Sequence, residues 1–337
     1  MRAAAIAVTL AALVVAGCGS TAKEAAPPKR AAATHKRVSK LPDPKEVGAN
    51  ELGMIPVIMH HRVANDPASE YDMTPAQFRR ELRTLYRRGY RPIAASDMVT
   101  GRIQVPPGKT PVVLTFDDSS REQFALLPNG KVDPETAVGI LLAFARNHSG
   151  FTPSATFFVI STLFDADDSD GPRLLAELAR LGFDIGDHTY HHANLGALDA
   201  TAVQREIILG KRMINDAVPE KEVRIFALPY GVYPKPHELA LHGSWDGDSY
   251  DYGGVFEVGS GPAPSPYSIN FDPLAIPRIR AAPWQGEEDF GSGYWLHYLQ
   301  IHRNRRYVSD GDPTKISFPA VFAGAVAPEY RSRANPY

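Results

Sequence analysis

The chain has 337 residues, a formal net charge of −2 at pH 7 and 44% hydrophobic residues. This hydrophobic content is ample for a folded core, and the near-zero charge lacks the basic excess that proteins use to bind nucleic acids. A single cysteine excludes an intramolecular disulfide and a structural zinc site built from several thiolates. We therefore expect a globular, monomeric protein without a nucleic-acid partner.

The segment 1–18 has the features of an export signal. Arg2 provides a positive start, and residues 3–16 form an almost wholly apolar run that is short for a membrane span. The small residues before Cys18 resemble the lipobox of bacterial lipoproteins, in which the cysteine is lipidated and becomes the new N-terminus. We therefore expect a lipid anchor at Cys18 that holds the exported protein at the outer face of the cell membrane. An ordinary signal peptide with an incidental cysteine is the alternative.

Residues 19–50 are predicted to be a flexible tether, because they are rich in Ala, Pro, Lys and Arg and show no apolar period. Their basic side chains would lie near an anionic membrane or wall polymer. The remaining residues, 51–337, are long for one domain but normal for an α/β barrel. We expect them to form one domain with a C-terminal extension.

Strand-like and helix-like patterns alternate along this domain. Strands are expected at 54–59, 90–93, 112–114, 155–160, 183–186, 224–228, 275–279 and 306–308. Helices are expected at 74–88, 133–146, 172–181 and 199–217. This alternation predicts a parallel sheet or barrel, in which the chemistry gathers beyond the carboxyl ends of the strands. Polar residues at such strand ends are His60-His61, Asp117-Asp118, Asp187-His188 and Pro229-Tyr230.

Asp117 and Asp118 are adjacent carboxylates at the end of a predicted buried strand, where they repel each other and burial adds to the cost. A bound cation would remove this cost, with one carboxylate as ligand and the other beside it as a base. His188 and His192 are four residues apart, so one helical turn would bring both rings to one face, with His191 as a rival ligand. Two imidazoles and one carboxylate leave a coordination position open, as in catalytic zinc sites. A cluster of surface histidines is the alternative.

Such a site would hydrolyse an amide or an ester. The metal would lower the pKa of its bound water toward ~7 and polarise a carbonyl, and the second carboxylate would take the proton as the water attacks. Zinc is the expected metal, although the same ligands accept cobalt, nickel or iron. The residues by themselves leave open whether Asp117 or Asp118 is the ligand.

Four motifs occur in order along the chain: Thr115-Phe116-Asp117-Asp118, Ala155-Thr156-Phe157-Phe158, His188-Thr189-Tyr190-His191-His192-Ala193-Asn194-Leu195 and Pro229-Tyr230-Gly231. Together they resemble the polysaccharide deacetylase family (NodB-homology domain, carbohydrate esterase family 4), over roughly residues 54–280. The resemblance implies an α/β fold, a distorted and incomplete (β/α) barrel. It also implies an enzyme that removes acetyl groups from N-acetylglucosamine polymers or, less often, from O-acetylated xylan.

The resemblance implies a role for each matching residue. Asp117 would be the general base, while Asp118, His188 and His192 would bind the metal. The turn Pro229-Tyr230 would contact the substrate, with the backbone N–H of Tyr230 holding the oxyanion. The expected substrate is an extracytoplasmic polysaccharide of the cell wall or of a biofilm that contains N-acetylglucosamine.

The segment 56–63 is similar to the branch of the family that includes biofilm poly-N-acetylglucosamine deacetylases, in which a histidine stands where this chain has His61. We expect His61 to be the general acid, and its strand neighbour His60 to point to the other face. His297 is an alternative acid, although its apolar neighbours favour a helix that packs on the barrel.

One position departs from the family. Ala227 stands where members often carry an arginine that orients the base, and we expect Arg278, at the end of a predicted strand, to supply that charge. The departure favours one alternative, a non-catalytic glycan-binding lipoprotein on the same fold. A hydrolase of an O-acetyl ester or a small cyclic amide is a further alternative. The aromatic loop 243–268 is expected either to stack on sugar rings or to fill a small core of its own.

Overall fold

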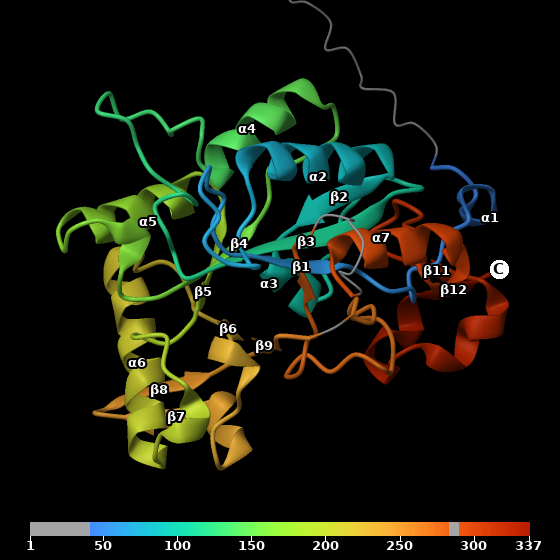
Figure 1. Cartoon of the computed structure of the whole chain (residues 1–337). Helices are drawn as coiled ribbons and strands as arrows, with labels where there is room; N and C mark the ends of the chain where they lie inside the picture. Colours follow the sequence, from blue (N-terminus) through green and yellow to red (C-terminus); the bar gives the residue numbers. More distant parts are fainter. Residues whose placement is uncertain (1–40, 260, 283–289) are drawn as a thin grey trace, which may run out of the picture. The chain divides into compact units, whose positions relative to one another are not determined.

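The structure is a computed structural model that describes residues 41–259, 261–282 and 290–337 (Figure 1). The predicted signal peptide, the predicted lipidation site at Cys18 and most of the predicted tether lie outside the described residues. The last part of that tether is folded, since Asp43 caps the short helix α1 (Pro44–Val47) and Asn50 is buried. The compact unit begins at Leu41, ahead of the boundary expected from composition.

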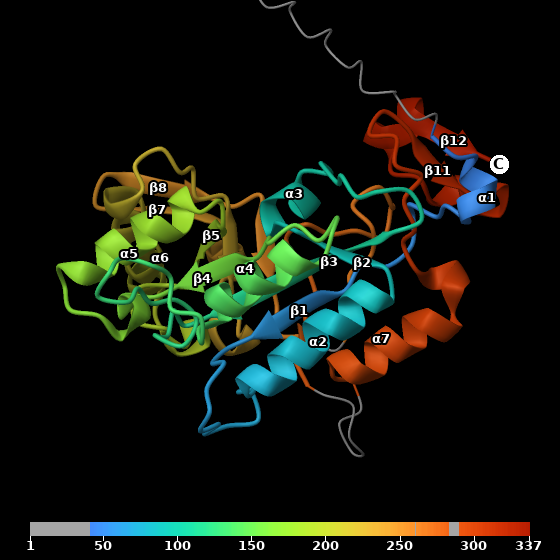
Figure 2. The ribbon, with the colours of Figure 1, turned by 90° about the horizontal axis from the view of Figure 1, so that it is seen from above.

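The centre of the fold is a curved sheet with the strand order β10-β1-β3-β4-β5-β6-β9, in which β2 pairs with the first half of β3 (Figures 1 and 2). All of these pairs are parallel. The predicted α/β fold, a distorted and incomplete (β/α) barrel, is therefore confirmed. The strands of the sheet are β1 (Val57–His60), β2 (Tyr90–Ile93), β3 (Thr110–Asp117), β4 (Thr156–Val159), β5 (Asp184–Asp187), β6 (Ile225–Ala227), β9 (Gly254–Phe256) and β10 (Ile279–Arg280).

Helices α2 and α4 lie on one face of this sheet and α3 packs into the core on the other face, as Figure 1 shows. Figure 2 shows α7 beside α2. The first long helix begins with a capping box between Thr74 and Gln77 and buries Phe78, Leu82 and Leu85 on one side, as their spacing predicts. The helices are α2 (Pro75–Arg87), α3 (Ala95–Val99), α4 (Ala137–Asn147), α5 (Asp170–Arg180), α6 (Ala200–Ala217) and α7 (Ser292–Ile301). Short 3₁₀ turns lie at Leu163–Asp165, Leu195–Ala197, Pro229–Gly231, His237–Ala240, Arg303–Arg305, Ala320–Ala325 and Pro328–Arg333.

Three predicted elements differ from the observed ones. Helix α4 starts after Thr136, which caps it, because the side chain of Asp133 accepts the N–H of Glu135 in the preceding turn. The strand predicted at 275–279 is β10, which begins only at Ile279. Residues 306–308 make isolated bridges instead of a strand. The spacing of apolar residues indicates which segments are buried, but a buried segment such as 306–308 need not pair continuously with a neighbouring strand.

The aromatic segment at 243–268 folds onto itself. It contains most of the hairpin of β7 (His242–Trp245) and β8 (Asp248–Asp251), followed by β9. Tyr250 and Tyr252 are only 2% and 3% exposed, and the Trp245 ring lies 5.4 Å from the Arg212 guanidinium of α6. These aromatic side chains therefore fill a local core, which was one of the two expectations for this segment.

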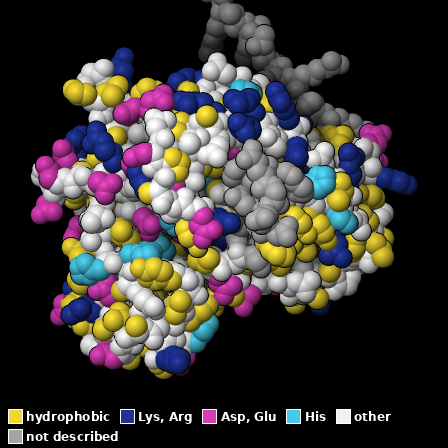
Figure 3. All heavy atoms as spheres, in the orientation of Figure 1, with side chains coloured by type: hydrophobic (Ala, Val, Ile, Leu, Met, Phe, Trp, Pro, Cys, Tyr) yellow, Lys and Arg dark blue, Asp and Glu magenta, His cyan; other side chains and the backbone are white. Residues whose placement is uncertain are grey.

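Successive residues of the strands point to opposite faces of the sheet and pack into two separate hydrophobic cores. Leu114 belongs to the core under the helices, whereas Val113 packs with Tyr267 and Phe318 of the C-terminal part. The C-terminal strands β11 (Ile316–Phe318) and β12 (Ala334–Pro336) pair with each other. No helix within the described ranges is long and apolar enough to cross a membrane. Acidic and basic side chains are intermixed on the face shown in Figure 3.

Buried Glu51 joins the start of the folded unit to the C-terminal extension. Its carboxyl group accepts hydrogen bonds from Tyr307 Oη at 3.1 Å, from Ser309 Oγ at 3.1 Å and from the Ser317 N–H at 2.9 Å. Burial and the neighbouring Asp310 raise the pKa of Glu51 to about 7, although these hydrogen bonds oppose the rise.

Candidate active site

Polar segments predicted from separate motifs meet at one edge of the sheet. Strands β1, β3, β5 and β6 run parallel, so their carboxyl ends share that edge. A cavity of about 460 Å³ opens there. Its lining includes His61, Tyr71, Asp117, Asp118, His188, His192 and Tyr230.

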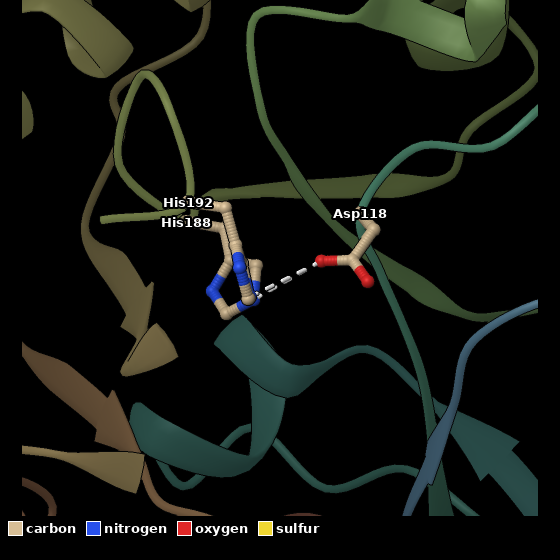
Figure 4. A group of neighbouring side chains, drawn as sticks. All are labelled: Asp118, His188 and His192. Carbon is tan, nitrogen blue, oxygen red and sulfur yellow. Dashed lines mark ion pairs between the residues drawn. The ribbon is translucent and has the colours of Figure 1, made fainter. Parts of the chain in front are cut away.

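Asp118, His188 and His192 form a group that could hold a metal ion. One ligand atom from each lies within 4.8 Å of the others. Asp118 Oδ1 is 3.4 Å from His192 Nε2 and 3.6 Å from His188 Nε2, and both rings point toward the carboxylate (Figure 4). This Oδ1 atom is buried and has no hydrogen-bond partner among the described residues. A buried acceptor without a donor, facing two imidazoles, fits a divalent cation that all three residues would bind.

The protonation of His188 also suits a metal ligand. Its Nδ1 lies 2.7 Å from the Ala227 carbonyl oxygen, which can only accept, so Nδ1 carries the proton and Nε2 keeps its lone pair. Burial lowers the pKa of His188 to about 3, although Asp117 opposes this effect, so the ring is neutral at physiological pH. Burial also lowers the pKa of His192.

The loop that carries the histidines is not helical, which corrects the expectation that one helical turn aligns the two rings. Thr189 and His192 adopt left-handed backbone conformations with φ of +64° and +54°. Such values are uncommon for residues with a Cβ atom. The His188 and His192 rings nevertheless lie 4.9 Å apart, because the turn reverses between them.

Asp117 is held in its charged form by Arg278. The carboxylate is buried, and its Oδ1 atom accepts from Arg278 Nη1 at 2.7 Å, while the Arg278 Nε donates to the Glu257 carbonyl oxygen at 2.8 Å. Burial alone raises the pKa of Asp117, but Arg278 and His188 outweigh it and lower the pKa to about 2. The structure thus places the Arg278 guanidinium beside the Asp117 carboxylate. Asp117 therefore has a positive partner although Ala227 stands where family members often carry an arginine.

The two histidines after β1 face opposite ways. His61 lines the cavity, with Nε2 3.9 Å from Asp118 Oδ2. His60 is fully buried on the other face, where Nδ1 donates to the Thr115 carbonyl oxygen and Nε2 contacts Glu81 at 2.7 Å. His297 lies on α7 and lines a different cavity, so the structure does not bring it to this site.

The turn after β6 forms another wall of the cavity. Tyr230 has a left-handed φ of +59° and is 61% exposed, and its ring lies 4.5 Å from that of His192. Pro229 before it is buried. The N–H groups of Gly231 and Val232 are bonded within the turn, to Leu228 O and Pro229 O.

Sequence reasoning did not single out Tyr71, Gln123 or Glu206. Tyr71 packs against His61 with ring centroids 5.1 Å apart, and the amide of buried Gln123 donates to the carbonyl oxygens of His61 and Asp117. Glu206 occupies a buried position of α6, and a charged residue on an apolar helix face was a signal that could have found it. No local pattern marks Tyr71 or Gln123, because their contacts arise from loops that cross between strands.

Comparison with known proteins agrees with this geometry. Residues 104–242 match the family model described as polysaccharide deacetylase. A chitooligosaccharide deacetylase of Sinorhizobium fredii is 32% identical over 126 residues, which are 37% of this chain and 49% of the relative. The chain therefore spans about half the length of this curated relative.

Solved structures share the fold. A polysaccharide deacetylase of Bacillus anthracis superposes with a TM-score of 0.53 at 20% identity, covering 72% of this chain and 69% of that one. A Streptococcus pyogenes deacetylase in complex with acetate has a TM-score of 0.50 at 18% identity, covering 70% and 96%. At these identities the likeness concerns the fold alone.

Proposed function

We propose that the protein is a metal-dependent polysaccharide N-deacetylase acting on an extracytoplasmic glycan that contains N-acetylglucosamine. The observation that carries this proposal is the pairing of two carboxylates with different surroundings. Asp117 is buried, charged and bonded to Arg278. The Oδ1 atom of Asp118 has no hydrogen-bond donor among the described residues and lies near the rings of His188 and His192. The match of residues 104–242 to the polysaccharide deacetylase family model supports the same reaction.

The roles follow from these surroundings. Asp118, His188 and His192 would hold the cation, for which zinc is our proposal, and a bound cation would acidify water and polarise an acetyl carbonyl. Asp117 would accept the proton, because its carboxylate stays ionised beside the cation site. Arg278 would keep this carboxylate oriented through the bond to Oδ1.

Two further groups would complete the reaction. His61 lines the cavity and would donate a proton to the leaving amine as general acid. The backbone N–H of Tyr230 would stabilise the negative oxygen that develops on the acetyl carbon.

The rim of the cavity suits a sugar polymer. Tyr71, Tyr230 and Val258 line it and are 38%, 61% and 42% exposed, so apolar faces surround a charged centre. Such faces can pack on the C–H side of pyranose rings. The Sinorhizobium relative is named for chitooligosaccharides, and we propose a related N-acetylglucosamine polymer of the cell wall or of a biofilm as the substrate.

Acetate release from peptidoglycan, poly-β-1,6-N-acetylglucosamine, chitin oligomers and O-acetylated xylan tests this proposal. The unaltered protein, Asp117→Asn and His188→Ala should be compared after metal removal and after zinc is restored. We expect release by the unaltered, zinc-loaded protein and a loss of several orders of magnitude in both variants. No acetate from any polymer would favour the non-catalytic glycan-binding alternative, and release from xylan alone would favour the esterase.

A further inference from the structure

The histidine loop contains a third imidazole, His191, which a buried carboxylate engages. Glu206 of α6 has a side chain that is only 5% exposed, and its Oε1 lies 2.9 Å from His191 Nδ1. Its Oε2 accepts the backbone N–H of His191 at 3.0 Å. The Glu206 carboxylate thus bonds to both the ring and the backbone of His191, which precedes the candidate ligand His192.

The same glutamate anchors the loop at a second point. Its backbone carbonyl oxygen accepts the N–H of Tyr190 at 3.0 Å, and the Tyr190 carbonyl oxygen in turn accepts the Ser161 N–H at 2.8 Å. These bonds lie between the two left-handed residues, Thr189 and His192. Left-handed residues persist only where surrounding contacts hold them, so the Glu206 bonds are placed to keep the loop in this form.

The orientation of the His191 side chain matters because its imidazole could bind a cation as well as those of His188 and His192. Its side chain is 61% exposed, and its ring packs edge-on against Tyr190 at 4.6 Å. A mobile imidazole beside His192 would offer the cation a competing nitrogen. Because Glu206 binds Nδ1, the ring is fixed away from the group of Asp118, His188 and His192.

We propose that Glu206 is a positioning residue that selects His188 and His192, and not His191, as the metal-binding histidines. This inference rests on the proposed function, because it takes the cation site as functional. Outer partners of metal-binding residues typically change metal affinity by about 10- to 100-fold when they are replaced. Glu206 would act in this way through the loop backbone and not through a bond to a ligand ring.

Zinc binding by calorimetry tests the proposal without any assay of catalysis. Glu206→Asp keeps the charge but is one methylene shorter, so it should lower zinc affinity by about 10- to 100-fold. Glu206→Gln keeps an oxygen that can accept the His191 N–H and gains an amide that can donate to Nδ1. This variant should therefore bind zinc with an affinity close to that of the unaltered protein. His191→Ala keeps the backbone bond and should bind zinc normally. Glu177→Asp, on the neighbouring helix α5, is the matched control, because Glu177 pairs with Arg180 on the surface.

The outcomes separate the two proposals. Failure of the unaltered protein to bind zinc would overturn both. Normal binding by Glu206→Asp, or a loss in His191→Ala as large as that in His188→Ala, would overturn this inference alone. Should Glu206→Asp fail to fold, hydrogen exchange in the metal-free unaltered protein decides the question. We expect protection of the His191 amide, and exchange at the rate of an open loop would refute the anchoring role.

Discussion

Replacement of Arg278 by methionine tests whether the buried ion pair keeps Asp117 charged. Arg278 is fully buried, and its Nη1 lies 2.7 Å from Asp117 Oδ1. Against the opposing effect of burial, Arg278 and His188 lower the pKa of Asp117 from 3.8 to about 2. By linkage this shift corresponds to about 2.5 kcal/mol of stability, which is present above pH 3.8 and is lost as the pH falls through about 2.

Removal of the arginine should cost more than this, because an unpaired carboxylate remains buried. The expected loss in the free energy of unfolding is about 3–5 kcal/mol near neutral pH. In the variant burial dominates, so the pKa of Asp117 rises above its ordinary value and the sign of the pH dependence reverses. Arg278→Met should therefore be less destabilised in mildly acidic than in mildly alkaline buffer.

Urea unfolding of the metal-free protein measures these effects. The set comprises the unaltered chain, Arg278→Met, Asp117→Asn and the double variant, which together form a double-mutant cycle. The double variant lacks the unpaired charge and should be more stable than Arg278→Met alone. Arg280→Met is the control, because Arg280 pairs with exposed Glu70 and should lose at most about 1 kcal/mol. Equal destabilisation of Arg278→Met and the double variant would refute the reasoning, since lost packing would then explain both.

Three further predictions concern other parts of the chain. Glu51 has a pKa of about 7 in the folded protein, whereas its ordinary value is 4.5. The free energy of unfolding should therefore fall by about 3 kcal/mol as the pH rises from 4.5 through about 7. Glu51→Gln should remove this fall, and a pH profile of melting that is unchanged in the variant would contradict the assignment. Tyr71→Ala should raise KM for a polymeric substrate by roughly 2- to 10-fold with kcat nearly unchanged, and an unaltered KM would exclude a sugar contact. The lipid anchor expected at Cys18 predicts that Cys18→Ala moves the protein from the membrane fraction to the soluble fraction, whereas retention at the membrane would argue against an anchor there.

Several elements could be predicted from local sequence because their causes are local. The capping box and apolar spacing of α2 depend on residues a few positions apart, and so does the start of α6 after Asp199, whose side chain accepts the Ala202 N–H. The adjacency of Asp117 and Asp118 at a strand end is likewise visible in the chain. These features led to the fold and to the set of residues that the cavity brings together.

Other features depend on strand order and register, which no local pattern contains. Arg278 is separated from Asp117 by 161 positions and reaches it because β10 pairs with β1, which in turn pairs with β3. His188 and His192 come together in a loop with left-handed residues, where helical spacing had suggested one turn of helix, and Glu206 bonds to His191 within that loop.

The chain by itself thus determined which residue types are available for the chemistry and which strands carry them, because neighbouring residues control strand and helix formation. The tertiary structure alone decided how the surroundings of these residues differ. It buries Asp117 against Arg278, leaves Asp118 Oδ1 without a donor, and turns His191 away. Each of these differences comes from contacts between distant segments, whose desolvation and charge give otherwise identical side chains different properties.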